Sequence, residues 1–229
     1  MRRELSVTCS LLLFITLLVS FPIAGLAKSQ KSDDNVLKTP VDGSKIVAET
    51  TFKTIMNLAS VYKLRVAYEA QTGGPANGTK ESRSQITLFR GTLEEFLNDL
   101  LQDEPRYTWT YQDGVINIFP ATRRDPRVAE ILDMRIKEFQ VGTSSGVLDA
   151  GNNICNTPEV SARLMKLGIT PIHFYSNGDL ERRSTKPPVT FRDKTVRELL
   201  NEWLRFNDGQ VWTIGMWGAD NKLLTIALR

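Results

Sequence analysis

Few residues in this sequence have the side chains that catalysis or metal binding requires. The chain has one histidine, His173, and two cysteines, Cys9 and Cys155. A zinc site usually needs further nitrogen or sulfur ligands at defined spacing, and these residues do not supply them. We therefore expect no metal site and no cofactor. We interpret His173 as a structural or partly exposed strand residue and Cys155 as a small side chain in a loop or at the edge of a core.

Motifs for nucleophilic and phosphate chemistry are also missing. A common serine hydrolase needs a nucleophile elbow such as G-x-S-x-G, and the nearest string, GTSSG from Gly142, does not match it. A phosphate-binding G-x-x-x-x-G-K-[ST] loop is absent. Four carboxylates lie opposite the apolar stripe of one predicted helix, where a solvated face explains them: Glu94, Glu95, Asp99 and Asp103. We predict that the protein is not an enzyme. A secreted hydrolase, relying on His173 or on carboxylates alone, is a third hypothesis.

The elements that would position side chains in this protein include an internal repeat. Residues 86–110, ITLFRGTLEEFLNDLLQDEPRYTWT, align without a gap on residues 189–213, VTFRDKTVRELLNEWLRFNDGQVWT, at an offset of 103 positions. The identical pairs are Thr87/Thr190, Thr92/Thr195, Glu95/Glu198, Leu97/Leu200, Asn98/Asn201, Leu101/Leu204, Trp109/Trp212 and Thr110/Thr213. A repeat of this length indicates two copies of one small module.

Each copy has the pattern of a strand, a capped helix and a hairpin. Alternating apolar residues predict the strand, at Ile86 and Leu88 in one copy and at Val189 and Phe191 in the other. A threonine followed three positions later by a glutamate has the spacing of a capping box, and apolar residues at i, i+3, i+4, i+7 and i+8 then give the helix one core face. Residues near Trp109 and Trp212 open the hairpins.

The remaining segments complete two modules. We predict an α+β fold of two tandem modules, each of order β-α-β-β-α-β-β, with helices packed on small mixed sheets. Module one takes residues 45–121, the linker 122–130, and module two 131–229. Further strands are expected at 46–48, 64–70, 131–141 and 171–175; helices are expected from Phe52 and from Thr157 with Pro158, the second ending at Gly168. Residues 142–156 are expected to be a loop.

The first 27 residues have the form of a secretory signal. A short basic start at Arg2 and Arg3 precedes an apolar run that Pro22 interrupts. We predict cleavage between Ala27 and Lys28, export to the periplasm and no membrane span after removal of the signal; retention of the segment as an anchor is the alternative. Residues 28–44 are polar and are predicted to be a flexible tether.

Charge and composition argue against nucleic-acid binding. The signal contributes two arginines and one glutamate, or +1 of the formal +3, which leaves +2 for the rest of the chain. That charge is too small for an electrostatic footprint, and neither copy has the aromatic strand motif of an RNA-binding module. What remains are surfaces: the edges of small sheets, which can accept a strand of a partner, and Trp217, a possible protein contact near the second hairpin turn.

The residues also resemble a known family. The segments FKTIMNLASVYKLRVAYE and TLEEFLNDLLQDEPRYTWTYQDGVINIF are similar to the short N-terminal (STN) module shared by secretins and TonB-dependent outer-membrane transducers; related secretin N-domains have a similar order. The first copy matches over most of its length, and the second from Pro188 onward. The resemblance implies small periplasmic α+β domains that bind other proteins, such as subunits of a secretion channel or a regulator in the inner membrane.

The printed sequence contains no region long enough for a secretin channel or a β-barrel, so the pore and receptor functions are not extended to it. We expect a non-catalytic periplasmic adaptor or scaffold that binds a protein partner in the cell envelope, in a secretion, pilus or outer-membrane receptor system. The alternative is a periplasmic binding protein for a small molecule or a cell-wall glycan. It would use the long loops that follow Ala70 and Ser176.

Overall fold

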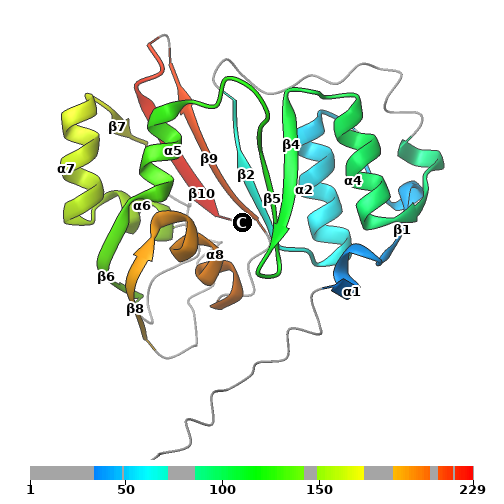
Figure 1. Cartoon of the computed structure of the whole chain (residues 1–229), viewed down its shortest axis with the longest axis horizontal. Coiled ribbons are helices and arrows are strands. Elements are labelled where there is room, and N and C mark those ends of the chain that lie inside the picture. The colour runs from blue at the N-terminus through cyan, green and yellow to red at the C-terminus, as the bar shows by residue number, and fades with distance from the viewer. Residues whose placement is uncertain are drawn as a thin grey trace, which may run out of the picture. The chain divides into compact units, whose positions relative to one another are not determined.

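The computed structural model describes residues 34–47, 49–71, 86–141, 149–172, 188–206, 211–218 and 220–228 (Figure 1). All of them belong to one compact unit, Ser32–Arg229. The helices are α1 (Asp34–Leu37), the 3-10 helix η2 (Gly43–Lys45), α2 (Thr51–Tyr62), α4 (Leu93–Gln102), α5 (Pro126–Asp133), α6 (Asp149–Cys155), α7 (Pro158–Leu167) and α8 (Val196–Phe206). The strands are β1 (Pro40–Asp42), β2 (Val66–Glu69), β3 (Arg90–Thr92), β4 (Tyr107–Gln112), β5 (Val115–Pro120), β6 (Arg135–Val141), β7 (Thr170–Pro171), β8 (Val189–Thr195), β9 (Val211–Trp217) and β10 (Leu223–Leu228). The predicted α+β class is confirmed.

Both predicted capping boxes are present. The Thr92 N–H donates to Glu95 Oε2 (2.7 Å), and the Glu95 N–H donates back to Thr92 Oγ1 (3.3 Å). The matching distances at Thr195 and Glu198 are 2.7 and 3.1 Å. The apolar positions that follow are buried in α4 and α8, so the stripe that the spacing predicts does face the core.

The two copies pair their strands in the same way. In the first copy β1 and β3 form an antiparallel pair, and β5 lies between its hairpin partner β4 and the parallel strand β2. In the second copy β6 and β8 form the antiparallel pair, and β10 lies between β9 and the parallel strand β7. The sequence repeat is therefore accompanied by a repeat of strand pairing.

One parallel contact joins the two sets. Strand β2 pairs with β9, from Val66 opposite Val211 to Glu69 opposite Ile214, and this pairing gives a six-stranded sheet of order β4-β5-β2-β9-β10-β7. The Ala70 N–H extends the ladder with a bond to the Ile214 carbonyl (2.7 Å). The small sheets expected from the sequence thus share one larger sheet, while the division into modules at 45–121 and 131–229 stays a prediction.

Two hydrophobic cores lie on the two faces of this sheet. Val66 and Tyr68 of β2 point into one core, and Ala67 between them points into the other, as the alternation of a strand requires. Helices α2 and α4 cover the first core, and α5, α6 and α8 cover the second (Figure 1). Because both faces are covered, all four residues of β2 are buried, which is the usual condition of a central strand.

Several predicted boundaries are wrong. The described part of the expected tether, 34–44, holds α1 and β1, and Val41 is buried because β1 pairs with β3. Ile46 is buried outside any strand. Residues 86–88 are helical, Leu88 is exposed, and the strand begins at Arg90. Two or three apolar residues are too short a run to separate a strand from a helical turn.

The region between the copies also differs from the prediction. The expected linker 122–130 and the start of the expected strand 131–141 hold helix α5, and β6 begins only at Arg135. The Asp125 side chain caps α5 and Pro126 is at its start, so these residues mark the first turn of a helix and not the linker predicted there. The expected loop 142–156 contains α6 over Asp149–Cys155.

Candidate functional site

Strand β4 forms one edge of the six-stranded sheet. It pairs with β5 in antiparallel register, from Tyr107 opposite Pro120 to Gln112 opposite Val115. Within the part of the chain that the structure describes, no strand pairs with the other side of β4. An open edge can accept an added strand, so β4 is a candidate binding element.

The backbone of Trp109 is directed outward from this edge. The Ala121 N–H donates to the Arg106 carbonyl (2.8 Å), which makes these two residues a hydrogen-bonded pair. Such pairs alternate along an antiparallel ladder, so Thr108 and Thr110 bond to β5 and Trp109 between them does not. The N–H and C=O of Trp109 therefore face the position of an added strand.

The side chains of β4 leave this edge accessible. The strand reads YTWTYQ and has no lysine, proline or break in its register, which are the features that commonly block edge pairing. The half-buried Trp109 indole donates from Nε1 to Asn98 Oδ1 (3.0 Å) and is held against α4. Thr110, on the other face of the strand, is exposed.

Helix α4 runs alongside β4 and presents a polar stripe. Glu94, Asn98 and Gln102 are spaced by four positions, so they share one face of the helix, and all three are exposed. Asn98 connects this face to the strand through Trp109. The helix has two acidic residues in its first turn, and no lysine or arginine occurs from Leu93 to Asp103. The stripe beside the open edge therefore carries the negative charge of Glu94 and no positive charge.

The equivalent edge in the second copy is occupied. Strand β9 corresponds to β4, and β2 pairs with it on the side that β4 leaves open. Trp212 corresponds to Trp109 and donates from Nε1 to Asn201 Oδ1 (2.8 Å), which repeats the tryptophan–asparagine contact of the first copy. Trp212 is fully buried, with Ala67 of β2 opposite it in the register.

A cluster of ion pairs links β2, the strand added at this edge, to Arg124 and to helix α8. Glu69, at the end of β2, has a side chain only 2% exposed. Arg124 donates to both of its carboxylate oxygens (2.8 and 3.0 Å), and Arg197 of α8 donates to Oε1 (2.7 Å). A buried carboxylate needs such partners, because an unpaired charge is strongly destabilising inside a protein. The Arg124 guanidinium also lies 5.8 Å from the centre of the Phe119 ring.

A second contact ties α8 to the first copy. The Arg205 guanidinium donates to the Asp113 carbonyl in the turn between β4 and β5. Arg197, Asn201 and Arg205 are spaced by four positions, like Glu94, Asn98 and Gln102 in α4. The stripe of α8 thus contacts a neighbouring strand and turn of the first copy. Among the described residues, no strand or turn of the second copy hydrogen-bonds to the equivalent stripe of α4.

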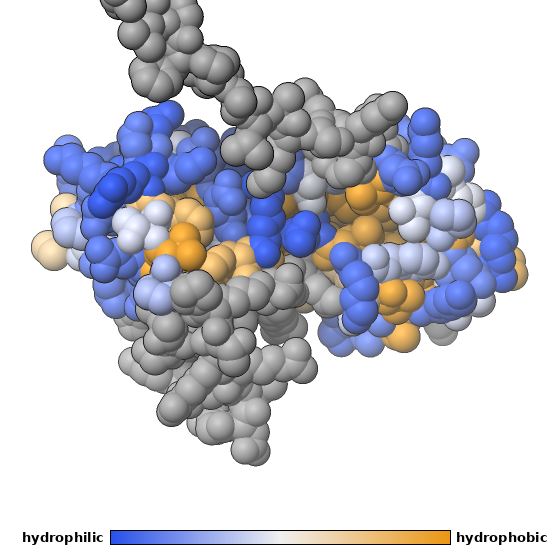
Figure 2. All heavy atoms as spheres, turned by 90° about the horizontal axis from the view of Figure 1, so that it is seen from below, coloured by the Kyte–Doolittle hydropathy of each residue, from blue (hydrophilic) through white to orange (hydrophobic). Residues whose placement is uncertain are grey.

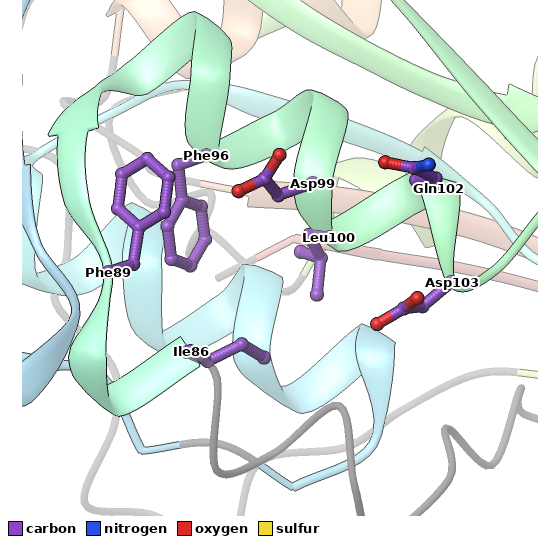
Figure 3. A pocket seen from close by; sticks show the side chains of 7 residues that line it. All are labelled: Ile86, Phe89, Phe96, Asp99, Leu100, Gln102 and Asp103. Atoms are coloured by element: carbon purple, nitrogen blue, oxygen red, sulfur yellow. The ribbon is translucent and has the colours of Figure 1, made fainter.

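A small pocket opens on another side of α4. Its volume is about 200 Å³, and its lining residues are Ile86, Phe89, Phe96, Asp99, Leu100, Gln102 and Asp103. Figure 3 shows the rings of Phe89 and Phe96 side by side and Asp103 at the opposite end. The two ring centres are 5.1 Å apart and the rings are nearly perpendicular, at 85°. The pocket is apolar at one end and acidic at the other.

Large hydrophobic side chains are exposed at a few positions of the described chain. Hydrophilic residues cover much of the face shown in Figure 2, with hydrophobic residues visible between them. The exposed large hydrophobic residues come from different segments: Val47, Val61, Leu88, Met165 and Leu223. Single exposed apolar residues are normal on protein surfaces.

Trp217 lies at the end of β9 and is half-buried. Its indole Nε1 donates to Thr225 Oγ1 (2.8 Å), so the ring is fixed on the β9–β10 hairpin. Gly215 permits this packing, because a Cβ there would come within 3.2 Å of the Trp217 Nε1. The role of Trp217 as a protein contact stays a prediction.

Cys155 is buried in the second core, and burial raises the pKa of its thiol to about 12. A thiol that stays protonated is a poor nucleophile, which agrees with a packing role. His173 and the predicted cleavage position at Ala27 and Lys28 lie outside the described residues. Glu94, Glu95, Asp99 and Asp103 are exposed, as predicted.

The described residues include neither a metal-binding cluster nor a helix that could span a membrane. No group of three or more His, Cys, Asp or Glu side chains in them could hold a metal ion. None of the helices described is both long and apolar enough to cross a bilayer. Comparison with known proteins found no matching protein-family model, curated protein or solved structure.

The sequence reading missed the ion cluster of Glu69, Arg124 and Arg197. Two signals pointed to it. A glutamate ends the otherwise apolar strand VAYE, and the repeat alignment places Arg197 opposite Glu94, which is a reversal of charge between two otherwise similar helices. Neither signal reveals which strand edge the arginine contacts, because that depends on the pairing of β2 with β9.

Proposed function

We propose that this protein is a non-catalytic, protein-binding adaptor that accepts a strand of a partner at the open edge of β4. The observation that supports the proposal is the contrast between the two equivalent edges. The edge of β9 is filled by β2, and no described strand fills the edge of β4. Main-chain hydrogen bonds supply affinity in such strand addition, and side chains beside the edge supply specificity.

We place this activity in the periplasm of a Gram-negative bacterium. The signal-like residues 1–27 and the resemblance to STN modules support that location, and the same resemblance favours a partner from a secretion, pilus or outer-membrane receptor system. The exposed Glu94 on α4 gives such a partner an electrostatic target, since complementary charge steers association.

Binding of a small molecule or a cell-wall glycan is the alternative function, and the pocket beside α4 favours it. Its volume of about 200 Å³ is below the range of about 300–1,000 Å³ that is typical of ligand sites. The open edge therefore receives more weight than the pocket.

Site-specific photo-crosslinking tests the adaptor function. A photoreactive amino acid replaces Thr110, which is exposed on β4, or as a matched control Met165, which is 78% exposed on α7. We expect a crosslink from position 110, and not from 165, to one envelope protein. In the purified complex, amide exchange of Trp109 should slow at least about tenfold as its N–H gains a partner. Equal crosslinking at both positions, or unchanged exchange at Trp109 in the complex, would refute strand addition.

A further inference from the structure

The joint, that is, the parallel pairing of β2 with β9, is an example within this chain of an edge strand that has received a further strand. It has three features. The added strand is parallel to the edge strand. A small residue, Ala67, lies opposite the edge tryptophan, Trp212. Two positions later a charged residue, Glu69, pairs with Arg197 on the helix beside the edge.

The open edge of β4 has the same tryptophan–asparagine contact as β9, the strand that receives β2 in the joint. At the repeat offset, Trp109 and Asn98 correspond to Trp212 and Asn201, and both tryptophans donate to their asparagine at similar distance, 3.0 and 2.8 Å. The two indoles are therefore held in the same way against their helices. An incoming strand meets Trp109 where β2 meets Trp212.

The size of one partner residue follows from this geometry. Ala67 is 1% exposed and Trp212 opposite it is 0% exposed, so both are packed within the second core. A larger side chain at position 67 would have to enter this packed core beside the indole, and overpacking is destabilising. The residue opposite Trp109 is therefore expected to be small.

The charge of a second partner residue follows from the helices. Arg197 stands one helical turn before Asn201, and Glu94 stands one turn before Asn98. Arg197 receives the acidic Glu69 of β2. Glu94 occupies the same place with the opposite charge, on a helix that has no basic residue. An acidic side chain would be repelled there, and a basic one attracted.

We infer that the open edge of β4 takes a parallel strand from a different protein, with a small residue opposite Trp109 and a lysine or arginine two positions later, facing Glu94. This inference rests on the proposed function and specifies its partner. A second copy of this chain fits poorly. Its β2 is already buried and ends in an acidic residue. The other edge strand of its six-stranded sheet, β7, includes Pro171. Its neighbours Thr170 and Ile172 donate their N–H groups to Lys222, next to β10, and to Leu224 of β10, so the outward position at Pro171 has no N–H to donate.

Two synthetic peptides of equal composition test the charge rule against the intact protein. The first has the native sequence of residues 63–71, KLRVAYEAQ; the second exchanges its charges by Arg65→Glu and Glu69→Arg, and both are capped at their ends. Equal net charge removes non-specific attraction from the comparison. The dissociation constants come from the NMR shift of the Trp109 backbone amide, which reports on the edge alone.

We expect the charge-exchanged peptide to bind about tenfold more tightly than the native one. In the Glu94→Arg variant, which changes an exposed side chain, the order should reverse. An added Ala67→Leu change in the charge-exchanged peptide should abolish the shift.

Binding of both peptides at Trp109 with equal affinity would overturn the charge rule and leave strand addition intact. No shift of the Trp109 amide with any peptide would overturn both. Sedimentation of the purified protein tests the second copy as occupant. If the protein forms head-to-tail oligomers and the Trp109→Arg variant is monomeric, self-association replaces the inference. If the wild-type protein is monomeric, the inference is supported.

Discussion

The hairpins β4–β5 and β9–β10 have the same place in the two copies but different neighbours. In the first, no described strand pairs with the outer side of β4; in the second, β2 pairs with the equivalent side of β9. The tryptophan–asparagine contact is present in both, so it belongs to the repeated unit itself. The residue one turn earlier is acidic in α4 and basic in α8, so it varies with the neighbour. The comparison separates residues that build the fold from residues that select what binds to it.

The largest contrast is expected between the two tryptophans. Trp212→Ala removes a fully buried side chain and should lower the free energy of unfolding by about 3–5 kcal/mol. Trp109→Ala removes a half-buried side chain at the open edge and should cost about 1 kcal/mol. Urea denaturation of both variants measures the difference. Equal losses would mean that the two edges are equally covered in solution.

A smaller effect is expected at the ion cluster that closes the occupied edge. Glu69→Gln leaves Arg124 and Arg197 without their carboxylate, and because both arginines are partly exposed we expect a loss of about 2 kcal/mol. The matched control is Glu49→Gln, which breaks the exposed pair of Glu49 with Lys53 and should change stability by less than about 0.5 kcal/mol. A loss at Glu69 no larger than the control would show that the cluster does not stabilise the joint.

The sequence predicted the parts of this comparison that local signals determine. Thr92 with Glu95 predicted a capped helix because both partners lie within one turn, and the stripe from Leu93 to Leu101 predicted its buried face because helical spacing is short-range. The hairpins followed from alternation on both sides of a short turn. Such signals also let the repeat alignment relate the two tryptophans without a structure.

The sequence did not predict the joint, because edge pairing is a long-range choice. No residue in VAYE states that β2 adds to β9, 145 positions away at Val66 and Val211. The short segments failed for a related reason. Helix α5 and strand β1 have only eight and three residues, and the burial of Val128 and Val41 comes from contacts with distant parts of the chain.

The smallest effects are expected where the copies agree, at the two capping boxes. Thr92→Ala and Thr195→Ala should each lower the free energy of unfolding by about 1 kcal/mol.

Hydrogen bonds from the backbone N–H of these threonines hold the pKa of Glu95 and of Glu198 below the ordinary value of 4.5. A lowered carboxyl pKa gives stability that is present above that value and is lost as the pH falls through the folded-state pKa. Alanine keeps this backbone N–H and loses only the threonine hydroxyl, whose hydrogen bond also lowers the carboxyl pKa. The difference between wild type and each variant should therefore shrink only slightly below pH 4.5, as urea denaturation at a series of pH values would measure. Since both boxes have the same geometry, a large inequality between Thr92→Ala and Thr195→Ala would show that the joint with β2, which is near α8 only, also stabilises the cap of that helix.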